Sequence, residues 1–197
     1  MKKSDGGLFL SWPEAFQAGA GTAGGKGWNL GRLDRYGFRV PAGGVLGAGA
    51  YQSFIEENGL LEEISGISES VSADNIGEKK VEETLALLRE KIMAGYIPLN
   101  IREELDSRLK TAGILDKPVA VRSSASAEDS GGASFAGIHD SFLNVRGINN
   151  ICSAVKECYA SLWTPRAVAY RRKMNVSDEE MSQAVVIMKM VEARAAG

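Results

Sequence analysis

Short apolar runs along the chain alternate with longer stretches in which apolar residues return every three or four positions. Short runs bounded by glycine, proline or polar residues are typical of strands. The last of these runs, AVVIMKMV, is apolar at nearly every position, as expected for a strand that is covered on both faces. The predicted strands are residues 8–10, 39–47, 119–121, 142–145 and 184–191.

The longer stretches predict amphipathic helices, several of which have a recognisable start or end signal. Val81, Leu85, Leu88 and Ile92 lie on one helical face. Glycines at the ends of apolar-periodic stretches indicate C-terminal caps. The predicted helices are one carrying Trp28, Leu33 and Tyr36 and closed by Gly37, 48–58 before Gly59, 81–92, 101–109 before Gly113, 151–162, and one beginning at Pro165 with Thr164 as its N-cap. The fold class that follows is α+β, with a mixed α/β arrangement as its alternative.

Composition narrows the functional classes. The chain has 197 residues, of which 44% are hydrophobic, enough for a sizeable core. Its formal net charge of −2 argues against a nucleic-acid partner. The short apolar run near the N-terminus fits neither a signal peptide nor a membrane span, so we expect a cytoplasmic protein without a membrane partner. Cys152 and Cys158 form no metal or redox motif and are interpreted as reduced packing residues.

The glycine-rich segment from Gly19 to Leu33 resembles two nucleotide motifs only in its letters. GAGTAG follows a helix-like stretch instead of a strand, and AGTAGGKG has Gly27 where a P-loop needs Ser or Thr. Gly24 and Gly25 allow a ligand to approach the backbone closely. Lys26 and a helix N-terminus follow, and together these features favour the binding of an anion. The alternative is a glycine-rich turn that only caps a helix.

The stretch VAVRSSASAEDSGGASFAGIHDSFLNV, residues 119–145, offers a second cationic site. A strand ending at Val121 would present Arg122 rigidly, and a guanidinium suits phosphate oxygens. The following loop would add hydroxyl and amide donors to a phosphate; these come from Ser123, Ser124, Ser126, Ser130, Ser134, Gly131, Gly132 and Gly137. In the alternative, Arg122 pairs with Glu128 or Asp129 and the serines only satisfy turns. Two separated cationic loops favour a triphosphate ligand.

At these residues the sequence resembles the N-terminal nucleotide-binding region of the phosphoenolpyruvate synthase and pyruvate phosphate dikinase family, which has an ATP-grasp-like fold. The resemblance implies that residues 1–197 are the first lobe of such a domain, with 184–197 as the hinge strand towards a second lobe. The matching stretches occur in the family's order: GGKGWNL (24–30), VPAG (40–43), VAVRSSASAED (119–129), SFAGIHDSFLNV (134–145), SLWTPRAVAYR (161–171) and VVIMKMV (185–191).

The resemblance also assigns site residues. Lys26 and Arg122 match the family's catalytic phosphate contacts. The implied nucleotide-binding set is Gly24, Gly25, Lys26, Arg122, Ser123, Gly137, Ser141, Met188, Met190 and Val191. Two positions depart from the family pattern: Met188 replaces a glutamine at the hinge, which weakens the case for adenine selectivity, and Ile138 replaces a polar residue in the covering loop. ATP and Mg²⁺ are the implied cofactors, with the metal ligands outside this chain.

The implied activity is that of a kinase or phosphotransferase. In the complete enzyme ATP would be cleaved to AMP, and a phosphoryl group would pass to a carrier histidine on another domain and then to pyruvate or another acceptor, which is not bound here. Alternatives are an antibiotic or glucan acceptor, or a non-catalytic nucleotide-sensing module. We expect no turnover from these 197 residues alone. His139 is interpreted as a solvent-facing loop residue and not as the carrier, with a phosphate or ribose contact as its alternative.

The remaining aromatic and basic residues have plainer interpretations. Trp12, Trp28 and Trp163 are expected to pack in the core. Arg166, Arg171 and Arg172 are expected on the solvated face of their helix, with Arg166 near the cleft as an alternative.

Overall fold

The computed structural model describes residues 8–125, 141–174, 176, 178 and 183–192. Over these residues the chain is a mixed α+β structure, as predicted. Its elements in chain order are β1 (Phe9–Leu10), α1 (Trp12–Ala18), α2 (Ala20–Arg35), β2 (Gly43–Leu46), α3 (Ala48–Glu57), α4 (Leu61–Ser70), α5 (Lys79–Ala94), α6 (Leu99–Thr111), β3 (Val119–Ala125), β4 (Ser141–Val145), α7 (Ile148–Ser161), α8 (Pro165–Lys173) and β5 (Gln183–Lys189).

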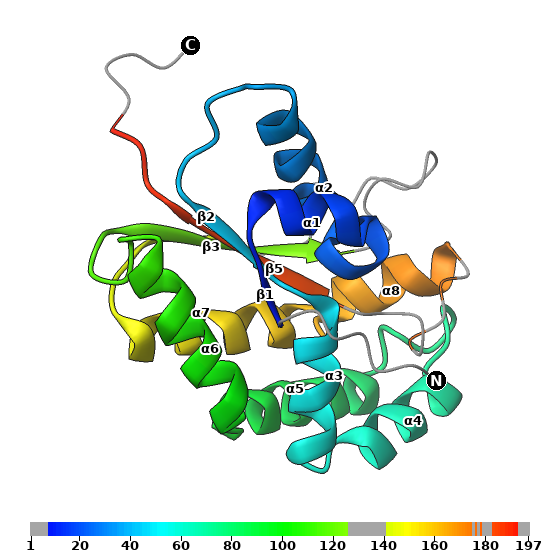
Figure 1. The fold of residues 1–197 in the computed structure, drawn as a ribbon. Coiled ribbons are helices and arrows are strands. Elements are labelled where there is room, and N and C mark those ends of the chain that lie inside the picture. The colour runs from blue at the N-terminus through cyan, green and yellow to red at the C-terminus, as the bar shows by residue number, and fades with distance from the viewer. Residues whose placement is uncertain (1–7, 126–140, 175, 177, 179–182, 193–197) are drawn as a thin grey trace.

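The strands form one sheet in the order β1-β2-β5-β3-β4, and each neighbouring pair is antiparallel. The last strand of the chain, β5, lies in the middle of the sheet between β2 and β3 (Figure 1). Residues 183–187 of β5 are all buried, which accounts for the continuous apolar run in its sequence.

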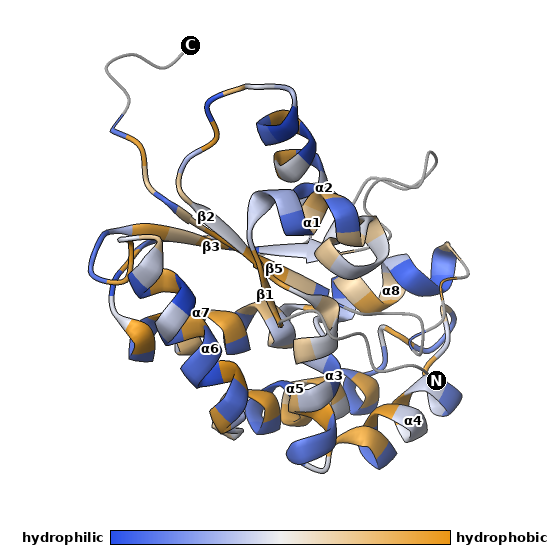
Figure 2. Cartoon of the chain, viewed as in Figure 1, coloured by the Kyte–Doolittle hydropathy of each residue, from blue (hydrophilic) through white to orange (hydrophobic). Residues whose placement is uncertain are grey.

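The two faces of the sheet are covered unequally (Figure 1). Helices α1 and α2 lie over one face, which we call the α2 face, where Val45, Ala184 and Val186 pack with Trp12 and Ala23. Helices α3–α8 cover the other face, where Val121 and Ile187 join the larger core. In Figure 2 the strands are mostly apolar, and the helices carry polar residues on the sides turned away from the sheet. The larger layer therefore supplies most of the buried apolar surface that stabilises the fold.

Several helix ends form as the sequence predicts. Helix α1, whose start was not predicted, begins with a capping box in which the Ser11 hydroxyl and backbone N–H donate to the Glu14 carboxylate. The Thr164 side chain accepts a hydrogen bond from the Ala167 N–H at the start of α8. Positive φ angles occur at Gly37, Gly59 and Gly113, the residues predicted to close helices. Cys152 and Cys158 are free and buried, and Trp12 and Trp163 lie in the core.

Strand β2 covers only Gly43–Leu46 of the predicted 39–47, and two further elements differ from the prediction. Strand β3 does not end at Val121 but continues to Ala125, because Ser123 and Ser124 pair with Val185 and Ala184 of β5. Helix α4 was not predicted, since only Ile67 among its residues is fully buried and its serines and glutamates hide the apolar spacing. No helix in the described ranges is long and apolar enough to cross a membrane.

Candidate nucleotide-binding site

Helix α2 is broken at Gly24, whose φ of 66° and ψ of 166° lie outside the helical region. A Cβ atom added at Gly24 would lie 2.0 Å from the Ser124 carbonyl oxygen, so only glycine fits against β3 here. The helix resumes with Gly25, Lys26 and Gly27 in its first turn. Amide groups in a first turn have no carbonyl partner within the helix and point out of its end. The kink therefore places Lys26 at a helix N-terminus that lies against β3.

The other glycines of α2 serve packing. A Cβ atom at Gly27 would lie 2.7 Å from a methyl group of Val45, and one at Gly31 would lie 2.4 Å from the Trp12 carbonyl oxygen. Gly24, Gly27 and Gly31 share one side of the helix because they are three and four residues apart. The glycine-rich sequence thus lets α2 lie close to the sheet and to α1, so Gly24 has a packing role in addition to the anion contact that the sequence predicts.

Arg122 extends from the α2 face of β3. It lies opposite Val186 of β5 and opposite Ser141 of β4, and Val186 in turn lies opposite Val45 of β2. The Arg122 Nε donates a hydrogen bond to the Ser141 Oγ at 3.3 Å. Arg122 is half-buried, and its strand is paired on both sides, so the backbone that carries its guanidinium is held rigidly. Ser124 lies on the same face two residues further, about 7 Å along the strand.

The structure therefore brings Gly24, Lys26, Arg122 and Ser141 to one face of the sheet. Ser123 does not join them. It is 1% exposed and lies between Val121 and Ala125, both of which belong to the core on the opposite face. The predicted contributions of Gly137, Ile138 and His139, together with the Glu128 or Asp129 alternative for Arg122, lie outside the described residues.

The end of β5 carries the residues that the resemblance places beside the adenine. Met188 lies opposite Gly43 and Ala120, and its side chain packs in the apolar cluster of the α2 face with Trp28 and Val40. Met188 and Arg122 are diagonal neighbours on adjacent strands, which places their Cα atoms about 7 Å apart. The Met190 N–H donates to the Pro118 carbonyl, so this amide is already used within the protein. Val191 is 66% exposed.

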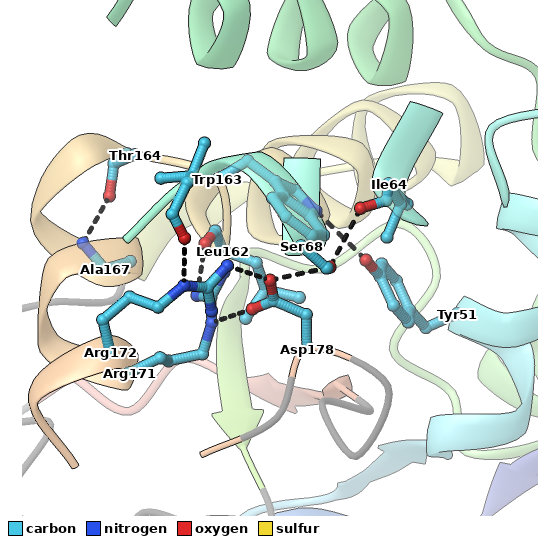
Figure 3. A network of polar contacts seen from close by, with 11 residues as sticks. Tyr51, Ile64, Ser68, Leu162, Trp163, Thr164, Ala167, Arg171, Arg172 and Asp178 are labelled. Atoms are coloured by element: carbon cyan, nitrogen blue, oxygen red, sulfur yellow. Dashed lines mark hydrogen bonds and ion pairs between the residues drawn. The ribbon is translucent and has the colours of Figure 1, made fainter. Parts of the chain in front are cut away.

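A second polar cluster surrounds Arg171 on the opposite face (Figure 3). Its Nε donates to the Asp178 carboxylate at 2.8 Å, its Nη1 donates to the Leu162 carbonyl at 2.6 Å, and its guanidinium lies 5.1 Å from the Trp163 ring centroid. Arg172 and Ser68 also donate hydrogen bonds to Asp178. Burial opposes ionisation of Asp178, but the contacts from Arg172 and Arg171 outweigh it and hold the pKa of that carboxyl below its ordinary value.

This cluster corrects the prediction that the arginines of α8 form a solvated face. Arg166 is exposed, as predicted, but Arg171 is 1% exposed. Arg171 turns inward because Asp178 supplies a counter-charge and Trp163 supplies a flat apolar surface. The arrangement ties α8 to the segment before β5 and resembles a structural ion pair more than a ligand site.

Two further features bear on the site. A hollow of about 660 Å³ is lined by β4 and α7, but of the predicted site residues it contains only Ser141, so we do not place the ligand there. Across the described part of the chain, no group of three or more His, Cys, Asp or Glu side chains could hold a metal ion.

Comparisons with known proteins identify the family of the chain. Residues 20–197 match the family model described as pyruvate phosphate dikinase, AMP/ATP-binding domain. A probable phosphoenolpyruvate synthase of Staphylothermus marinus is 40% identical over 96% of this chain and 23% of its own length. A rifampicin phosphotransferase of Bacillus cereus is 41% identical over 88% of this chain and 20% of its own length. The chain thus spans about a fifth to a quarter of these relatives.

Proposed function

Because the chain belongs to the pyruvate phosphate dikinase AMP/ATP-binding domain family, we propose that it is the nucleotide-binding part of an ATP-dependent phosphotransferase of the phosphoenolpyruvate synthase type. The triphosphate binds on the α2 face between Lys26 and Arg122, and the adenine lies towards Met188. Residues 1–197 form the first lobe of an ATP-grasp-like domain, and the chain from residue 184 onwards leads to a second lobe.

One observation carries the proposal. The kink that precedes Lys26 and the strand that carries Arg122 are in direct contact, and both cations lie on the same face of the sheet. These two residues are far apart in sequence and come from different kinds of element. A polyphosphate needs cations at more than one point along its length, and a flexible ammonium beside a planar guanidinium meets that need.

The residues of this chain act on the phosphates by position and charge. Arg122 offers parallel N–H donors to phosphoryl oxygens, and Lys26 offers a mobile charge to the same group. Both would stabilise the negative charge on these oxygens as phosphoryl transfer proceeds, a reaction that depends mainly on positioning and electrostatics. Neither residue acts as a nucleophile. One phosphoryl group passes to a carrier histidine elsewhere in the parent enzyme, a second leaves as inorganic phosphate after attack by water, and AMP remains.

Magnesium belongs to the proposal, but the described residues do not fit it by themselves. They contain no group of acidic side chains that could hold a metal ion. We therefore derive no step through the metal and expect its ligands to come from a second lobe. AMP formation by residues 1–197 alone would contradict this expectation.

The acceptor of the phosphoryl group is not encoded in this part of the protein. The chain is 40% identical to a probable phosphoenolpyruvate synthase and 41% identical to a rifampicin phosphotransferase. Relatives named for different acceptors are therefore equally similar here. Pyruvate is the first candidate and an antibiotic is the second, and parts of the parent enzyme outside this region make the choice.

The test is an amide-resolved NMR titration with ATP up to millimolar concentrations. We expect shifts at Gly25–Gly27, Arg122, Ser141 and Met188, and their loss in Arg122→Met. The matched control is Arg102→Met on α6. Arg102 is also half-buried and also donates a hydrogen bond to an uncharged side chain, that of Asn149 at 2.7 Å.

The possible outcomes distinguish a specific site at Arg122 from a general effect of charge. The control variant should bind ATP like the unchanged chain, because Arg102 does not lie on the α2 face. Equal loss of binding in both arginine variants would indicate an effect of total charge and would contradict a specific site at Arg122. Shifts confined to the hollow beside β4 and α7 would place the nucleotide elsewhere.

A further inference from the structure

The hydroxyl of Ser124 occupies an unusual position inside helix α2. Its Oγ accepts a hydrogen bond from the Gly27 N–H at 3.1 Å and donates one to the Ala23 carbonyl at 3.0 Å. In an unbroken helix the Gly27 N–H would bond directly to the carbonyl of Ala23, four residues earlier. The serine hydroxyl is therefore inserted into one helical hydrogen bond, which is a recognised cause of a kink.

The insertion is buried and closely packed. Ser124 is 0% exposed, and Ala23 and Gly27 are buried as well. A Cβ atom at Gly24 would lie 2.3 Å from the Ser124 Oγ, so glycine and serine fit each other at this point. Because buried polar groups need partners, the hydroxyl satisfies one donor and one acceptor that the kink would otherwise leave without one.

The bridged segment contains Lys26. The two hydrogen bonds hold the chain on either side of residues 24–26, and the serine that makes them is two residues from Arg122 on the same strand face. The hydroxyl thus ties the segment that carries Lys26 to the strand that carries Arg122. Without the hydroxyl, Gly27 and Ala23 can restore the direct helical bond, which straightens α2 and shifts Lys26.

We propose that Ser124 is a positioning residue, which fixes the distance between Lys26 and Arg122 and so adapts the site to a chain of several phosphates. This inference rests on the proposed function, since it concerns the same nucleotide site. It assigns no contact between Ser124 and the ligand.

The test compares ATP with AMP in Ser124→Ala. We expect ATP affinity to fall about tenfold, because one charged group is displaced from the phosphates. AMP affinity should stay within about twofold, since a single phosphate does not need both cations at a fixed distance. A general loss of structure would weaken both nucleotides, so the ratio of the two affinities separates positioning from stability.

Three further substitutions sharpen the test. In a Lys26→Met background, Ser124→Ala should cause no additional loss of ATP affinity, because the two residues act through one interaction. The control is Ser161→Ala, which removes another buried serine that donates to a backbone carbonyl, that of Cys158 at 2.7 Å. It should leave the ratio of ATP to AMP affinity unchanged. If Ser124→Ala does not fold, Ser124→Cys keeps the shape of the side chain and weakens both hydrogen bonds.

The results distinguish this inference from the proposed function. If the unchanged chain binds ATP on the α2 face but Ser124→Ala and Ser124→Cys keep the same ATP to AMP ratio, the positioning role is wrong and the site stands. If the unchanged chain binds neither nucleotide on this face, the proposed function fails first. A direct readout is the Gly27 amide proton, whose NMR resonance should move in Ser124→Ala before any ligand is added.

Discussion

Arg171 and Arg122 lie on opposite sides of the sheet and show two different uses of an arginine. Arg171 is enclosed, with a carboxylate at 2.8 Å, a carbonyl at 2.6 Å and an indole ring beneath it. Arg122 is half-buried, and among the described residues it has one hydrogen-bond partner, the uncharged Ser141. The first charge is balanced within the protein. The second is held rigidly by the sheet and is balanced by no carboxylate in the described ranges, as an anion site requires.

The strongest test of this contrast is Asp178→Asn. The substitution leaves Arg171 buried without its counter-charge, which typically costs about 3–5 kcal/mol of folding free energy. Urea denaturation should show a clearly lower midpoint. The control is Glu83→Gln, which breaks an exposed pair on α5, Lys79–Glu83 at 3.7 Å, and should leave the midpoint unchanged. A loss below about 1 kcal/mol in Asp178→Asn would show that Arg171 is not held by this ion pair.

The same contrast explains what the sequence could and could not predict. Arg171 and Arg172 follow the helical pattern of an exposed face, and their partner Asp178 lies beyond the end of the helix, where no periodicity links it to them. The position of a counter-charge depends on tertiary structure, so the prediction for Arg171 was wrong. The strand before Arg122 was predicted because Val119–Val121 have a clear strand pattern, and that strand is confirmed, although it continues through Arg122 to Ala125.

Ser124 and the sheet order show a second limit. The SSA sequence after Arg122 is typical of a loop, and only pairing with β5 makes it a buried strand. The central place of β5 follows from contacts between distant segments, which local patterns do not encode. By contrast, helices α5 and α6 and the cap of α8 were predicted from spacing and capping residues, because these signals are local.

The second prediction is that substitution of Arg122 lowers ATP affinity and leaves stability nearly unchanged, the opposite of what is expected for Asp178. Arg122→Met should lower ATP affinity about tenfold to a hundredfold, because hydrogen bonds to charged groups are removed. Its unfolding midpoint should stay close to that of the unchanged chain, since within the described ranges the guanidinium makes only the 3.3 Å hydrogen bond to Ser141. Arg122→Lys should recover part of the affinity, because it restores the charge without the planar pair of donors. A large fall in stability would assign Arg122 the same structural role as Arg171.

The third prediction is that acid reduces the contribution of the Arg171–Asp178 ion pair to the free energy of unfolding. The pKa of Asp178 is held below its ordinary value of 3.8, so its stabilisation is fully present above that pH and is lost as the pH falls through the lower, folded-state value. Between pH 7 and pH 3 this carboxyl should contribute a loss of at most about 1 kcal/mol. Denaturation midpoints of the unchanged chain should therefore fall more steeply with acid than those of Asp178→Asn. Parallel curves would contradict a depressed pKa.

The smallest expected effect lies at the base end of the site, where Arg122 cannot discriminate because ATP and GTP present the same phosphates. Under the proposed function the base lies beside Met188, an apolar side chain in the same cluster as Trp28 and Val40. Met188→Gln introduces an amide that can hydrogen-bond to a purine edge, so the ratio of ATP to GTP affinity should rise about twofold to tenfold. Competition binding with the two nucleotides measures the ratio, with Leu87→Gln on the exposed side of α5 as the control. An unchanged ratio would place the base away from the end of β5 and would leave the proposed phosphate contacts of Lys26 and Arg122 unaffected.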